Sequence, residues 1–256
     1  MPYLLQSVIL FAAGLTAGVI NSVAGGGTLI SFPALMLTGV PAVVANATNT
    51  VALLPGIASS LVAYRKELAA QRAWAWRFAP ISLVGGLIGG ILLIQTGEAQ
   101  FRSIVPYLIL FATLLFTFQG RVSRWLEIEA HTIEQSRHGL AAAILFQFCV
   151  AVYGGYFGAG IGILMLAALG ILGQTRIHEM NSLKVLLALL INAAAAVYFI
   201  WSGAVLWSSV VILGIGSLAG GYAGPRLARK MGEKPVRIFV CIVGFAIGIY
   251  FLWERG

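Results

Sequence analysis

Two glycine-rich breaks in apolar sequence are where this chain could bind a solute. The first is Asn21-Ser22-Val23-Ala24-Gly25-Gly26-Gly27-Thr28, and the second is Tyr153-Gly154-Gly155-Tyr156-Phe157-Gly158-Ala159-Gly160. No charged residue precedes Arg65, and each glycine in such a run weakens a helix by roughly 1 kcal/mol relative to alanine. The N–H groups freed at a break, and the positive end of the helix that follows, suit a small anion. The alternative is that the glycines only let helices cross closely.

The polar residues near both breaks complete the candidate site. Backbone donors are expected from the glycines, orienting contacts from the asparagines, and charge neutralisation from the lysine. The predicted substrate-binding residues are Asn21, Gly25, Gly26, Gly27, Thr28, Asn46, Asn49, Gly158, Gly160, Asn181 and Lys184.

Two of these assignments have structural alternatives. The run Asn46-Ala47-Thr48-Asn49 could cap the third apolar segment, because Asn and Thr favour helix N-termini. An intramembrane lysine is a functional candidate, but Lys184 is expected about one turn into its helix and could snorkel to the membrane interface.

Signals for an enzyme are weak. The chain has no Asp, and His131, His138 and His178 lie in loops without the spacing of metal ligands. Cys149 and Cys241 lie in apolar spans and give no disulfide framework. No phosphate-binding nucleotide loop is present. We therefore expect no catalytic residues, no metal and no cofactor.

Composition predicts an integral membrane protein. The 256 residues are 60% hydrophobic and only 9% charged, whereas a soluble domain carries about 25% charged residues. The net charge of +8 does not predict nucleic-acid binding, because the basic residues lie in short loops between apolar spans. We expect membrane lipid to surround most of the chain. A homo-oligomer is compatible with the sequence.

The apolar sequence divides into segments that predict an all-α fold with about eight to ten membrane segments. The segments are 4–23, 28–38, 43–64, 78–96, 102–119, 139–157, 160–172, 181–201, 207–225 and 236–253. Segments 28–38 and 160–172 are too short to cross a core of about 30 Å. Because each follows a glycine break, we expect half-helices or arms of re-entrant hairpins.

The two halves repeat with an offset near 133 residues. Asn46 and Asn49 lie over Asn181 and Lys184, and glycine-rich stretches in both fourth segments also correspond. In those fourth segments we favour close helix packing as the role of glycine. The expected organisation is a first membrane repeat at 1–120, a cytoplasmic linker at 121–138 and a second membrane repeat at 139–256.

The basic residues predict that the halves are inverted. If their clusters face the cytoplasm, only Arg102 and Arg255 remain outside. The 66–76 connection is then cytoplasmic, whereas the uncharged 202–206 connection is external. Both termini are predicted to be external. Inverted repeats with interrupted helices are typical of secondary transporters.

The same motifs resemble the sulfite exporter TauE/SafE family of bacterial membrane proteins. The resemblance rests on the stretch from Gly18 to Pro33, on Ala45-Asn46-Ala47-Thr48-Asn49-Thr50 and Ala63-Tyr64-Arg65, and on the stretch from Tyr153 to Gly162 with Asn181-Ser182-Leu183-Lys184. It covers essentially the whole chain. It implies a multi-pass transporter of the bacterial inner membrane that exports sulfite, a sulfonate or a related small sulfur-containing anion. The alternative function is a non-transporting membrane scaffold or assembly factor.

Overall fold

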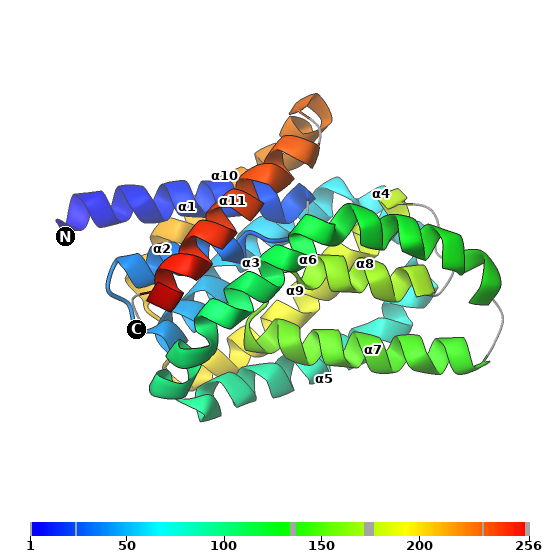
Figure 1. The fold of residues 1–256 in the computed structure, drawn as a ribbon, viewed down its shortest axis with the longest axis horizontal. Coiled ribbons are helices and arrows are strands. Elements are labelled where there is room, and N and C mark those ends of the chain that lie inside the picture. The colour runs from blue at the N-terminus through cyan, green and yellow to red at the C-terminus, as the bar shows by residue number, and fades with distance from the viewer. Residues whose placement is uncertain (1, 24, 134–136, 172–176, 232, 254–256) are drawn as a thin grey trace.

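The computed structural model describes residues 2–23, 25–133, 137–171, 177–231 and 233–253, and all its regular elements in these residues are helices (Figure 1). This confirms the predicted all-α class. The helices are α1 (Tyr3–Val23), α2 (Thr28–Leu37), α3 (Ala42–Ala63), α4 (Arg65–Ala70), α5 (Arg72–Thr96), α6 (Glu98–Ile133), α7 (Arg137–Tyr156), α8 (Ile161–Ile171), α9 (Ile177–Trp201), α10 (Trp207–Met231) and α11 (Glu233–Trp253).

The long helices are those of a multi-pass membrane protein. Within the described residues, seven helices are long and apolar enough to cross a membrane. Two others, α2 and α8, have 10 and 11 residues and therefore rise only about 15–17 Å. Each begins directly after a glycine break, as the sequence predicts for the two short segments.

Several helices extend beyond the apolar segments. Helix α5 begins at Arg72 and not near residue 78, α9 begins at Ile177 and not near 181, and α6 runs on to Ile133 through much of the predicted 121–138 linker. The reason is that Arg, Lys and Glu form helices about as well as Leu does. Apolarity therefore marks the stretch in lipid and not the end of the helix. The side chains of residues 119–139, like the predicted cytoplasmic Arg176, lie outside the described part of the chain.

The halves pack on each other reciprocally. Helix α1 lies along α10 at one edge of the molecule, and α5 lies along α7 at the opposite edge (Figure 1). In both pairs the backbones meet through glycine: a Cβ added to Gly220 would collide with the Leu15 carbonyl, and one added to Gly89 with the Val152 carbonyl. The expected packing role of the fourth-segment glycines is confirmed, because small residues are what allow such close approach.

The N-terminus of α3 is capped from another helix. Both carboxylate oxygens of Glu98, the first residue of α6, accept hydrogen bonds from α3 N–H groups, namely those of Ala42 and Val43, the latter at 2.9 Å. A carboxylate is favourable at a helix N-terminus because it satisfies free donors and complements the helix dipole. The suggestion that Asn46-Ala47-Thr48-Asn49 caps this helix is therefore wrong, since α3 begins before that run.

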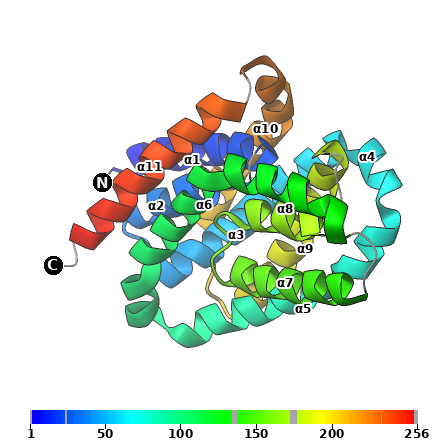
Figure 2. The same cartoon turned by 45° about the vertical axis from the view of Figure 1, so that its right-hand side comes forward.

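The two connections used to predict topology lie at opposite ends of α9. The Gln71 side chain, which follows α4, donates a hydrogen bond to Glu179 in the first turn of α9. The 202–206 connection follows the last residue of α9, about 33 Å away along the helix. Tyr3, near the N-terminus, lines the same depression as Leu206, and both termini lie toward one end of the molecule (Figures 1 and 2).

This arrangement generates a topology prediction. In a variant whose Cys149 and Cys241 are replaced by serine, Ser202→Cys should react with a membrane-impermeant maleimide applied to intact cells. Lys66→Cys should react only after the cells are permeabilised, because it lies at the other end of α9. Labelling of both positions from the same side in intact cells would contradict the predicted inversion.

Candidate functional site

The two glycine breaks lie against each other. Gly25 has a φ of +80°, and Gly158 and Gly160 have φ values of +81° and +78°, a left-handed conformation that side chains with a Cβ rarely adopt. A Cβ added to Gly25 would lie 3.1 Å from the Cα of Gly162, at the start of α8. Each half therefore contributes a break and the beginning of a short helix to one place.

Hydrogen bonds within the protein hold the first break in its conformation. The Gly25 N–H donates to the Ile20 carbonyl at 3.1 Å, and the Gly27 N–H donates to Asn21 Oδ1 at 2.8 Å. These two donors are therefore occupied within the protein, contrary to the expectation that both would face an anion. Within the described residues, the Thr28 N–H has no hydrogen-bond partner, as the first turn of a helix requires unless a cap or ligand supplies one.

The second break is built in a similar way. The Gly158 N–H donates to the Tyr153 carbonyl at 3.3 Å, and the Tyr153 hydroxyl donates to the Ala159 carbonyl at 2.8 Å. Among the residues described, the N–H groups of Ile161 and Gly162 have no hydrogen-bond partner. The start of α8 thus presents two donors, and its dipole adds partial positive charge.

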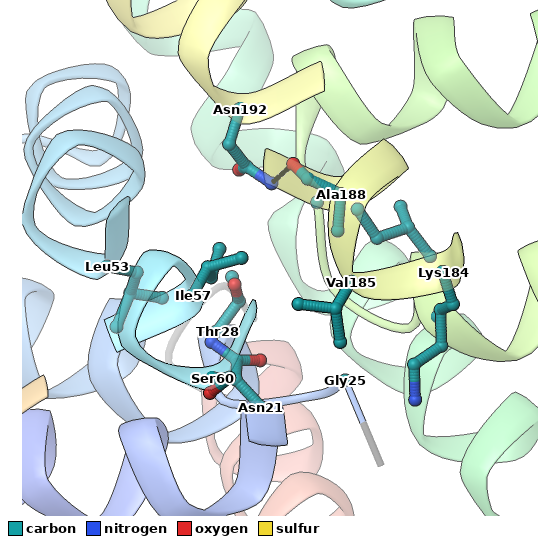
Figure 3. A pocket seen from close by; sticks show the side chains of 13 residues that line it. Asn21, Gly25, Thr28, Leu53, Ile57, Ser60, Lys184, Val185, Ala188 and Asn192 are labelled. Carbon is teal, nitrogen blue, oxygen red and sulfur yellow. Dashed lines mark hydrogen bonds between the residues drawn. The ribbon is translucent and has the colours of Figure 1, made fainter. Parts of the chain in front are cut away.

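A cavity between the halves is bordered by both short helices (Figure 3). Its volume is about 30 Å³, counted as the space open to the centre of a water-sized sphere. It is lined by Asn21, Gly25, Thr28, Leu53, Ile57, Ser60, Gly158, Ile161, Gly162, Lys184, Val185, Ala188 and Asn192. Figure 3 shows Asn21 and Thr28 on one side of this space and Val185 and Lys184 on the other.

Lys184 is the only charged side chain that is fully buried in the described part of the chain, with 2% exposure. It lies about two turns into α9, deeper than expected, because the helix begins at Ile177. Its Nζ donates a hydrogen bond to Asn181 Oδ1 at 2.8 Å. Burial of the whole side chain argues against the snorkelling alternative, in which the ammonium group reaches water.

The cavity gathers five of the predicted residues: Asn21, Gly25, Thr28, Gly158 and Lys184. The others do not line it. Gly26 faces the Phe116 ring, and Gly27 faces the Ala17 carbonyl, so both glycines serve close packing. Gly160 lies near Ala112, and Asn181 accepts a hydrogen bond from Lys184, which does line the cavity.

Asn46 and Asn49 support the breaks from α3. Asn46 Nδ2 donates to the Tyr156 carbonyl at 2.9 Å, at the last residue of α7. Asn49 Nδ2 reaches Thr28 Oγ1 at 3.4 Å, at the first residue of α2. Each asparagine thus contacts one edge of a break, and neither lines the cavity.

Two polar lining residues, Ser60 and Asn192, are absent from the predicted set. Asn192 donates from Nδ2 to the Ala188 carbonyl at 2.7 Å and turns toward Gly158. An amide in a long apolar run is a usable signal. Ser60 donates to the Gly56 carbonyl at 2.9 Å, and serine in a helix gives no comparable sequence signal because it can bond its own backbone.

Long apolar helices, two opposed half-helices and a cavity between two halves with polar residues in its lining are features of membrane transporters. A sequence model of the sulfite exporter TauE/SafE family matches residues 10–251. The chain therefore belongs to this family and is a multi-pass membrane protein.

Curated relatives match along nearly the whole chain. A "Probable membrane transporter protein" of Haemophilus influenzae is 28% identical over 97% of this chain and 95% of its own length. The Escherichia coli K12 protein named "Probable membrane transporter protein YfcA" is 26% identical over 96% of this chain and 89% of its own. The Bacillus subtilis protein "Probable membrane transporter protein YunE" is 23% identical over 96% and 97%.

The left-handed glycine at the first break can be tested against a matched position. Alanine at Gly25 should destabilise the fold by about 1–2 kcal/mol because of its positive φ, and its Cβ should also press on Gly162. Gly203→Ala has a similar φ of +72° but no neighbouring atom within 4 Å. The melting temperature in detergent should fall in both variants, and it should fall further in Gly25→Ala because only that Cβ also meets a neighbour. Equal melting temperatures in the two variants would contradict the close contact between the breaks.

Proposed function

We propose that this chain is a secondary transporter that exports sulfite, a sulfonate or a related small sulfur-containing anion across the bacterial inner membrane. The observation that carries the proposal is that Lys184 and the N-termini of α2 and α8 border one cavity. All three features favour negative charge. The name of the family to which the chain belongs, sulfite exporter TauE/SafE, supports the choice of anion.

Lys184 supplies the largest part of the attraction. Opposite charges 4 Å apart interact by about 4 kcal/mol at an effective dielectric constant near 20. A helix N-terminus contributes only about 0.3–1 kcal/mol, rising to about 2 kcal/mol where it is partly buried. The helix ends therefore orient the anion and accommodate its oxygens, while the ammonium group provides most of the affinity.

The size of the cavity favours a small solute. One buried water needs roughly 10–15 Å³ on the same measure of volume, so a cavity of about 30 Å³ suits an anion of a few heavy atoms. The apolar walls formed by Leu53, Ile57 and Val185 cannot satisfy polar groups of a longer substrate, which makes such substrates unfavourable there.

The proposed mechanism is alternating access between two inverted repeats, 1–120 and 139–256, joined by the 121–138 linker. Reciprocal packing of α1 on α10 and of α5 on α7 supports it. So does the separation of the 66–76 and 202–206 connections to opposite ends of α9. In this arrangement the same cavity opens to either side as one half rocks on the other, with both termini external. The solute is moved and not chemically converted.

Removing the charge of Lys184 tests the proposal. In proteoliposomes, Lys184→Met should lower sulfite affinity and flux by roughly tenfold or more, since each factor of ten needs about 1.4 kcal/mol. Lys66→Met, which removes an exposed lysine outside the cavity, is the matched control and should retain flux. Equal sulfite affinity in wild type and Lys184→Met would contradict the assigned role of the lysine.

Flux by the unaltered chain separates transport from a scaffolding role. The transporter should move labelled sulfite at a rate above that of empty liposomes. A correctly folded protein that binds no small sulfur anion and moves none would favour the scaffold or assembly factor.

A further inference from the structure

The two halves carry polar pairs at corresponding positions, and the side chains of these pairs differ in their hydrogen bonding. Asn46 and Asn49 on α3 occupy the repeat positions of Asn181 and Lys184 on α9. On α9, the ammonium group of Lys184 donates to Asn181 Oδ1 at 2.8 Å. On α3, the Oδ1 atoms of Asn46 and Asn49 are both buried without a hydrogen-bond partner within the described residues.

The missing partner is on the carbonyl side of each amide. Asn46 is 0% and Asn49 1% exposed, so bulk water does not reach them. The orientation of Asn46 is fixed, because its Nδ2 donates to the Tyr156 carbonyl, which can only accept. Two unsatisfied acceptors one turn apart on a helix are unfavourable, and native structures rarely leave such groups unmatched.

We propose that Asn46 Oδ1 and Asn49 Oδ1 form part of a binding site for a monovalent alkali cation, for which Na⁺ is the probe. Neutral amide and carbonyl oxygens are the ligands that hard cations prefer. The cation would take the place in the first half that the Lys184 ammonium takes in the second. The neutral side chain of Asn49 cannot supply that positive charge, so a cation from solution supplies it.

This cation site is linked to the anion cavity through shared residues. Asn49 contacts Thr28 Oγ1, and Thr28 lines the cavity. Asn46 holds the carbonyl of Tyr156, which begins the second break. A cation there opposes the negative charge of the anion and stiffens both breaks, so binding of either ion favours binding of the other. The inference rests on the proposed function and adds a cation that binds together with the anion.

A buried water is the competing occupant, because it could donate hydrogen bonds to both oxygens. Water and a cation differ in one measurable respect. A water site gives no dependence of anion binding on the identity of the cation in the medium, whereas a Na⁺ site does.

The first experiment measures sulfite affinity of the purified full chain by calorimetry in sodium gluconate and in N-methyl-D-glucamine gluconate at equal ionic strength. Sodium should tighten sulfite binding by roughly fivefold or more, the usual lower range of coupling between sites. Equal affinity in the two media overturns the cation site and leaves the anion proposal standing.

Two matched variants locate the effect. Asn49→Lys should make sulfite binding independent of sodium, because it builds in the ammonium group that α9 already carries. Methionine has a side chain about as long as that of lysine but carries no charge. Asn49→Met should therefore lose the sodium effect, and its sulfite binding should stay weak in both media. Persistence of the sodium effect in both variants overturns the assignment to Asn49.

Binding of radioactive sodium without sulfite tests the site separately from the proposed function. Saturable binding to wild type that is lost in Asn49→Met supports the site even if no sulfur anion binds. Absence of saturable sodium binding to the folded wild-type chain, with sulfite present and absent, overturns it. If either variant fails to fold, the comparison of the two media with wild type still decides the question.

Discussion

The constraint on which this structure depends is that backbone polar groups must be satisfied inside an apolar environment. The two glycine breaks expose such groups, and in the fold the breaks lie against each other, where other residues satisfy part of these groups. Asn21 takes the N–H of Gly27, and Asn46 crosses between the halves to take the carbonyl of Tyr156. The donors that remain, at the starts of α2 and α8, border the one cavity where the buried charge of Lys184 also lies.

The sequence predicts the parts of this arrangement that follow from local chemistry. A glycine triplet in an apolar run, two segments too short to span a bilayer and a lysine beside an apolar span are signals that can be read from the sequence alone. Asn21, Thr28 and Lys184 were therefore predicted for the site, and the structure brings them to one cavity. The family to which the chain belongs is likewise carried by the two breaks and the motifs that follow them.

The rest depends on tertiary packing, which a single sequence does not specify. Whether the amide of Asn46 faces a solute or the end of α7 is decided by how α3 and α7 meet. Glu98 caps α3 from 55 residues away in the chain, so no local pattern reveals it. Helix ends such as Arg72 and Ile177 were missed because hydropathy changes at the edge of the apolar stretch while the hydrogen-bonded helix continues.

The glycine contacts of α1 with α10 and of α5 with α7 have a mechanical consequence. Along these two seams main chain meets main chain, as at Gly220 with Leu15 and at Gly89 with Val152. Long side chains that interlock resist sliding, because they must change rotamer to pass one another. At Gly89 and Gly220 no such side chain stands between the two helices, so this source of resistance to sliding is absent from both edges.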